Sequence, residues 1–166
     1  MQVLSVAVGW QVYEITGDPL ALGLVGLAQF GPMFALTLYA GDVADRYPRR
    51  VVLALAHSVS CVCGVLFLFL NVWSVTDPNA FYAVLVLFGI ARAFSGPTGQ
   101  ELLPQLVPAE ILPKAIAWSS STFQVAVIAG PSMGGFALGW GPVFAYGLSA
   151  ALFAGVVVSL FAIQVV

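Results

Sequence analysis

The chain has 166 residues, of which 61% are hydrophobic and 7% are charged, and its mean hydropathy is +1.03. Soluble globular domains carry roughly 25% charged residues, so this chain cannot cover a water-exposed surface of its size, and disordered chains are poor in apolar residues. Five Lys and Arg against seven Asp and Glu give no basic field for nucleic acid, which leaves an integral membrane protein in a lipid bilayer.

Apolar stretches separated by charged residues or by Pro and Gly predict an all-α bundle of six membrane-spanning helices. Continuous apolar runs favour helices over barrel strands, which alternate in polarity over about 10 residues. The last five runs are long enough to cross ~30 Å of hydrocarbon at ~1.5 Å per residue. The first is short and the last ends within apolar sequence, so we expect both ends to be truncated. The predicted spans cover residues 1–15, 19–40, 51–73, 80–103, 114–138 and 142–166.

The basic residues between spans predict the orientation in the membrane. Arg46, Arg49 and Arg50 follow the second span, and Lys114 follows the fourth, whereas the first, third and fifth connections carry no Lys or Arg. Because basic connections stay on the inner side, we expect a multi-pass cell-membrane protein with both chain ends cytoplasmic.

The connection after the second span, residues 41–50, holds five charged residues in ten. We expect a short, tight turn in which Gly41 permits close backbone approach. Asp45 is suited to stabilise a helix N-terminus, and Pro48 to stop one helix and start the next. Composition alone also fits an ordinary basic anchor at the inner surface.

The fourth span contains one buried cation. Arg92 lies roughly 18 Å from the outer end of this span, where a charge costs about 2.5 kcal/mol or more and must face a cavity or a partner. Gly89, Gly96 and Gly99 share its helical stripe, whereas Glu101 lies off that stripe. The alternatives are a structural Arg paired with a carbonyl or carboxylate, and an Arg that handles substrate or protons.

The fifth span contains the string Gly-Pro-Ser-Met-Gly-Gly at residues 130–135. Pro131 removes a backbone hydrogen bond and is expected to kink the helix. Ala126, Gly130 and Gly134 form a small-residue ridge, and with Gly135 they allow tight helix packing. A packing face of this kind is common in membrane bundles.

These three segments together resemble the major facilitator superfamily. The segment 41–50 is similar to its signature loop, G-x-L-A-D-R-x-G-R-R/K, although Pro48 replaces the usual Gly. The resemblance implies a cytoplasmic latch that holds two transporter halves together in the outward-facing state. Asp45, Arg46 and Arg49 would then be gating residues. The matching positions are Gly41, Ala44, Asp45, Arg46, Arg49 and Arg50.

Two further motifs extend the resemblance. Arg92 to Gly96 is similar to the family's R-x-x-x-G on its fourth helix, which implies a role in proton transfer or substrate handling. The string Gly130, Pro131, Gly134, Gly135 resembles the antiporter motif, which implies export. The stretches 12–17, 22–26 and 103–108 resemble an enterobactin-exporter-like branch among the drug:proton antiporters.

The resemblance therefore implies the N-terminal six-helix half of a twelve-helix transporter. Its expected activity is proton-coupled efflux of small amphipathic molecules, drug-like or siderophore-like, by alternating access with a missing C-terminal half. The alternative is a non-transporting helical bundle that serves as an interaction module or a dimerising half-transporter. No enzyme activity, cofactor or metal site is predicted.

Other polar residues within the spans are ambiguous. His57 and Cys61 share one helix face, where packing is favoured over a proton or metal role. The hydroxyl run 119–122 lines a polar path or bonds back to its own helix. Gln29 and Gln124 either face a cavity or join helices.

Overall fold

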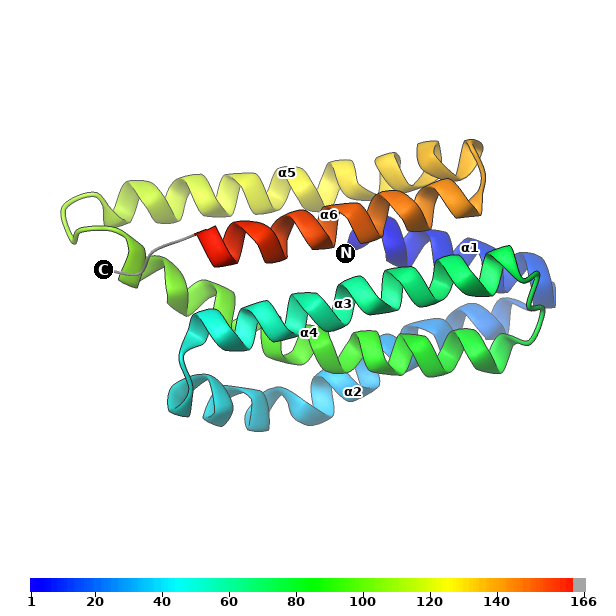
Figure 1. The fold of residues 1–166 in the computed structure, drawn as a ribbon, viewed down its shortest axis with the longest axis horizontal. Coiled ribbons are helices and arrows are strands. Elements are labelled where there is room, and N and C mark those ends of the chain that lie inside the picture. Colours follow the sequence, from blue (N-terminus) through cyan, green and yellow to red (C-terminus); the bar gives the residue numbers. More distant parts are fainter. Residues whose placement is uncertain (163–166) are drawn as a thin grey trace.

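The computed structural model describes residues 1–162, and within them the side chains outside 97–106. In that part of the chain every regular element is a helix, and the helices lie side by side along the long axis of the molecule (Figure 1). The all-α prediction is confirmed. The six helices are α1 (Gln2–Thr16), α2 (Pro19–Arg46), α3 (Arg49–Val72), α4 (Pro78–Leu106), α5 (Leu112–Gly139) and α6 (Pro142–Ala162).

Among the described residues, four segments are long and apolar enough to cross a membrane: α2, α3, α6 and the Pro78–Gly96 part of α4. The helix α5 has sufficient length, at 28 residues, but carries the hydroxyl run 119–122. The helix α1, at 15 residues, starts partway along the bundle (Figure 1).

Successive connections alternate between the two ends of the bundle (Figure 1). The helices α2 and α4 both begin at the end of the bundle opposite the α2–α3 connection (Figure 1), and each has an aspartate as its N-cap. Asp18 accepts a hydrogen bond from the Leu20 amide at 2.9 Å, and Asp77 accepts one from the Asn79 amide at 3.0 Å. A proline follows each cap, where its fixed φ suits the first helical position. Alternation brings the arginines after α2 and Lys114 of α5 to the same end.

The prediction of a turn over residues 41–50 is wrong in its length, because the connection is much shorter. The helix α2 continues to Arg46 and α3 begins at Arg49, so only Tyr47 and Pro48 separate them. The ion pair of Asp42 with Arg46 lies within α2 and lets charged residues continue this helix beyond its apolar part, whereas the ion pair of Asp45 with Arg49 crosses the connection to α3. Pro48 then forms the N-cap of α3, as expected from its chemistry.

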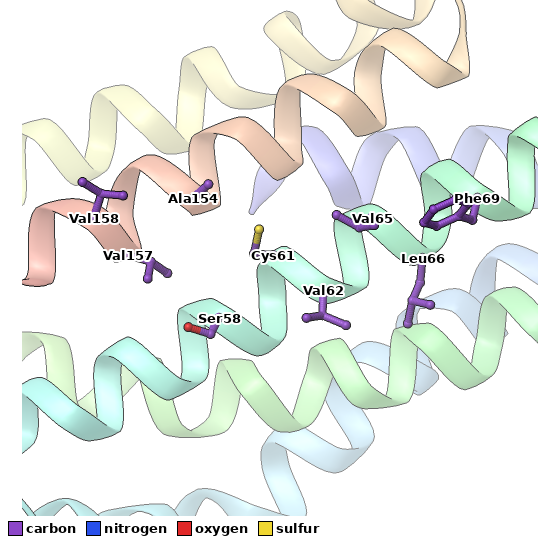
Figure 2. A pocket seen from close by; sticks show the side chains of 9 residues that line it. All are labelled: Ser58, Cys61, Val62, Val65, Leu66, Phe69, Ala154, Val157 and Val158. Carbon is purple, nitrogen blue, oxygen red and sulfur yellow. The ribbon is translucent and has the colours of Figure 1, made fainter.

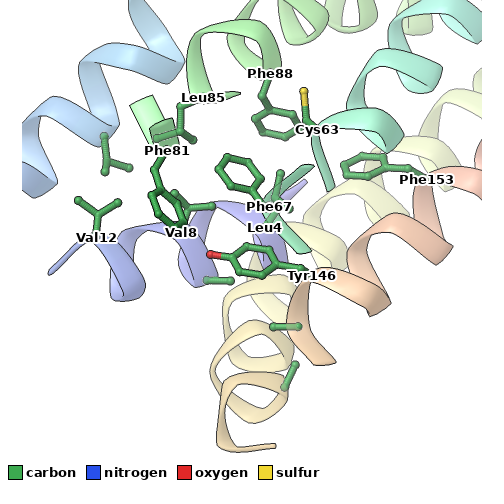
Figure 3. Packing of buried hydrophobic residues seen from close by; sticks show 14 of the residues in the cluster. Leu4, Val8, Val12, Cys63, Phe67, Phe81, Leu85, Phe88, Tyr146 and Phe153 are labelled. Carbon is green, nitrogen blue, oxygen red and sulfur yellow. The ribbon is translucent and has the colours of Figure 1, made fainter. Parts of the chain in front are cut away.

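The main core lies where α1, α3, α4 and α6 meet (Figure 3). Phe67 stacks between Phe81 and Tyr146, with ring centroids 6.0 and 5.5 Å apart. Phe88 meets Phe153 edge to face at 6.1 Å. Fully buried aromatic rings on three helices therefore fix their relative positions.

A buried polar cluster joins α1, α3 and α6 beside this core. Gln11 Nε2 donates to Asn71 Oδ1 at 2.7 Å, and Asn71 Nδ2 donates back to Gln11 Oε1 at 2.8 Å. The Tyr146 hydroxyl donates to Gln11 Oε1 at 2.6 Å. Because the bilayer offers no competing water, these reciprocal bonds hold the three helices in one register.

The helices α1 and α5 pack through the predicted small-residue ridge. A Cβ added at Gly130 would lie 2.6 Å from the Gln2 Cβ, and one added at Gly134 would lie 3.2 Å from the Val6 Cβ. Ala126 is exposed, whereas the space beside Gly135 is open. The helix α5 continues through Pro131 without interruption.

The two adjacent glycines provide a matched test of this contact. We expect Gly134→Leu to lower the free energy of unfolding by about 1–3 kcal/mol, because its side chain must displace α1. Gly135→Leu gains the same helix propensity, and no described residue lies within 4 Å of the Cβ position at Gly135. Thermal unfolding in detergent measures both, and equal melting temperatures for the two variants would contradict the packing.

Candidate functional site

Arg92 is the charged side chain that α4 carries into the interior of the bundle. It is half-buried, and its Nη1 donates to Gln29 Oε1 on α2 at 3.1 Å. Its guanidinium carbon lies 5.1 Å from the centroid of the Phe30 ring. The cation is thus stabilised by a neutral amide oxygen and an aromatic face.

Gln29 joins three helices at this point. Its side chain is 3% exposed, and its Oε1 accepts from Arg92 and from the Ser5 hydroxyl of α1 at 3.0 Å. One carbonyl oxygen with two lone pairs is thereby saturated. Of the two ambiguous amides, Gln29 is therefore an interhelical partner of the buried cation, whereas Gln124 is exposed.

A glycine one turn before Arg92 makes this contact possible. A Cβ at Gly89 would collide with the backbone oxygen of Gln29, so α2 and α4 approach each other closely there. On the other side of Arg92, Gly96 is exposed and nothing lies within 4 Å of its Cβ position. The face of α4 that carries Arg92 is therefore covered by α2 at Gly89, whereas no described side chain covers it at Gly96. The side chains at positions 99 and 101, which include Glu101, lie outside the described residues.

The arginines near the α2–α3 connection have different partners. Arg46 Nε lies 2.9 Å from Asp42 Oδ1, and Arg49 Nη2 lies 3.8 Å from Asp45 Oδ1. Arg50 Nη2 donates to the Phe161 carbonyl at 2.5 Å, at the C-terminal end of α6. The string at residues 130–135 of α5 lies elsewhere, where Gly130 and Gly134 pack against α1.

The side chain of Asp45 is 71% exposed, and a Cβ at Gly41 would meet nothing within 4 Å. The expected close approach at Gly41 is therefore not made to any described residue.

The remaining polar residues bond to nearby backbone. His57 Nδ1 lies 3.0 Å from the Leu53 carbonyl, and Cys61 Sγ donates to the Ala150 carbonyl at 3.5 Å. In the hydroxyl run, Thr122 bonds back to the Trp118 carbonyl at 2.9 Å. These residues thus have structural partners.

Two apolar grooves lie between helices. One, of about 390 Å³, separates α3 from α6 (Figure 2), and its Ser58 hydroxyl bonds to the Ala54 carbonyl at 2.7 Å. The other, of about 400 Å³, lies between α2 and α3 over α4. Neither groove is lined by a charged side chain, so neither includes Arg92.

Comparison with known proteins agrees with this arrangement. Residues 1–166 match the family described as transmembrane secretion effector. The chain belongs to this family of the major facilitator superfamily. As a member of the family with long apolar helices, it is a multi-pass membrane protein.

Curated relatives carry the name enterobactin exporter EntS. The protein of Salmonella choleraesuis is 33% identical over 154 residues, and those of Shigella boydii and Escherichia coli O1:K1 are 32% identical. Each alignment covers 90% of this chain and 36% of the relative, so the chain spans about a third of their length. No solved structure matches this chain.

Sequence reasoning found Arg92 and named Gln29 as one of two candidate amides, but it missed two other neighbours of the cation. Ser5 and Phe30 have no motif of their own, and only the fold brings them to the cation. Gln11 and Asn71 were also missed. A signal existed for these two, because amides within apolar spans demand partners.

The contrast between Gly89 and Gly96 gives a second test. We expect Gly89→Ala to force α2 away from α4, which breaks the bond between Gln29 and Arg92 and destabilises the protein by about 1–3 kcal/mol. Gly96→Ala has room for its methyl group and should unfold at the wild-type temperature or above it. If thermal unfolding shows the two variants to be equally stable, the close approach at Gly89 is refuted.

Proposed function

We propose that this chain is the N-terminal six-helix half of a secondary exporter of small amphipathic molecules, driven by protons and working by alternating access. A second six-helix half completes the transport path. The direction of transport, export, comes from the family description and from the names of the relatives, which are enterobactin exporters. Both ends of the chain lie in the cytoplasm, because the basic connections share one end of the bundle.

One observation carries this proposal: a half-buried cation on α4 is held by neutral groups. Arg92 bonds to Gln29 and lies against Phe30, at about 20 Å from the start of α4 at ~1.5 Å per residue. A purely structural bundle gains little from a charge there, since an apolar side chain would avoid the desolvation cost. A transporter uses such a charge to bind substrate or to respond to a proton.

The cytoplasmic charges support a gate. Asp45 and Arg46 are both largely exposed in this half, with side chains 71% exposed in each case, so they are available to a second half. In the proposed mechanism Asp45, Arg46 and Arg49 hold the cytoplasmic side closed while the outer side is open. Release of this contact opens the inner side for the next substrate.

Transport by the natural gene product tests the activity. We expect everted vesicles with an imposed proton gradient to accumulate a fluorescent amphipathic substrate. Arg92→Ala should abolish accumulation, while expression and thermal unfolding show that the protein still folds. Accumulation at the wild-type rate in the variant would refute the role of Arg92, and absence of any gradient-dependent transport would refute the exporter.

The gate has a matched pair of variants. Asp45→Asn should shift the resting protein towards the inward-facing state, because it removes the exposed carboxylate of the proposed latch. Asp42→Asn removes a carboxylate one turn earlier that pairs with Arg46 and should have a smaller effect. Labelling of a reporter cysteine from each side of the membrane measures the state, and unchanged labelling in Asp45→Asn contradicts the latch.

A further inference from the structure

Arg92 has more hydrogen-bond donors than the described residues can satisfy. A guanidinium carries five N–H groups and never accepts, and here it makes one side-chain hydrogen bond, to Gln29 Oε1. The ion pairs among the described residues both lie near the α2–α3 connection. No described carboxylate therefore compensates the charge of Arg92, and most of its donors have no acceptor in this part of the chain.

Gln29 carries a second unused donor group beside it. Because Arg92 can only donate, the oxygen of the Gln29 amide must face the guanidinium, and its NH₂ group, which lies in the same plane on the other branch of the amide, points elsewhere. Both hydrogen bonds of this side chain go to Oε1, and Nε2 donates to no described group. Because Gln29 is only 3% exposed, water does not satisfy this donor, and leaving it without an acceptor is unfavourable.

The surroundings leave room for a ligand on the open part of the stripe. Gly96 follows Arg92 by one turn, and no atom of the described side chains lies within 4 Å of its Cβ position. Phe30 keeps 54% of its surface exposed while its ring lies against the guanidinium. Unused cationic donors, an unused buried amide donor and an exposed aromatic ring thus lie close together.

We propose that Arg92 and Gln29 bind an anionic oxygen group of the transported molecule, and that Phe30 packs against a flat apolar part of the same molecule. The inference rests on the proposed function and deepens it, since it assigns the substrates to small amphipathic anions. A carboxylate or phenolate supplies the acceptors that both side chains lack, and pairing with a guanidinium strengthens those bonds. A cationic substrate would be repelled by the Arg92 guanidinium and would find donors in place of acceptors on Arg92 and on Gln29 Nε2.

Binding to the natural gene product in nanodiscs of zwitterionic lipid tests this assignment. Three naphthalene probes of similar size separate charge from shape: 1-naphthoate, neutral 1-naphthamide and 1-naphthylmethylammonium. We expect naphthoate to bind at least about tenfold more tightly than either of the others, which corresponds to ~1.4 kcal/mol.

The decisive variant is Gln29→Glu, which places a carboxylate of the same size against Arg92. It keeps a partner for the cation, so the fold remains, but it occupies the donors that the ligand needs. We expect naphthoate to bind about tenfold more weakly or worse. Gln124→Glu adds the same charge at the exposed amide of α5 and should leave the affinity unchanged. Arg92→Lys, which keeps the charge without the planar fork, should bind naphthoate more weakly than the wild type.

Several outcomes overturn the assignment. Equal affinities for the three probes, preference for the ammonium, or an unaltered affinity in Gln29→Glu would each do so. A lipid headgroup offers the same chemistry as a soluble anion, and nanodiscs of anionic lipid distinguish them. Unchanged naphthoate affinity supports a soluble ligand, and loss of affinity assigns the site to lipid and refutes the substrate.

The two proposals fail differently. Gradient-driven efflux confined to cationic or neutral compounds would leave the exporter standing and refute the anion site. Selective naphthoate binding, sensitive to Gln29→Glu but without any transport, would support the anion site and refute the exporter.

Discussion

The contact between Arg92 and Gln29 constrains how α1, α2 and α4 pack together in this bundle. A cation inside a membrane protein must have a partner, and the partner here is an uncharged amide on a neighbouring helix. That choice requires α2 and α4 to approach at Gly89, where no side chain fits between them. It also draws in α1, since Ser5 shares the same amide oxygen. Three helices are thereby organised around one charge that no described carboxylate neutralises.

Elsewhere the bundle is held by contacts that need no charge. Glycines at 130 and 134 let α1 pack closely on α5, and Gly64 lets α3 approach α6 so closely that an added Cβ would lie 3.3 Å from Ala150. The amide pair Gln11 and Asn71 adds direction to this packing through reciprocal hydrogen bonds. Small residues allow close approach and polar ones fix the register, because apolar surface alone does not distinguish helix from lipid.

The helices α2 to α6 were predictable because each follows from a long apolar run and a proline or charged break, whereas the run that forms α1 is short. The end of α2 was not predicted, because the charge-rich segment was expected to form a turn, whereas Asp42 and Arg46 pair within the last turns of α2. Arg92 stood out as a lone cation in apolar sequence. Its partner did not, because Gln29 and Gln124 are alike in sequence and only the packing of α2 on α4 distinguishes them. Tyr146, 135 residues from Gln11, carries no local signal of their bond.

The connection between α2 and α3 is short and joins the two helices closely at one end of this bundle. Only Tyr47 and Pro48 interrupt the helical path, so a displacement of the last turn of α2 is carried directly into the first turn of α3. In that first turn of α3, the Arg50 guanidinium donates a hydrogen bond to the Phe161 carbonyl near the end of α6. The end of α2, the start of α3 and the end of α6 are therefore coupled without an intervening long loop.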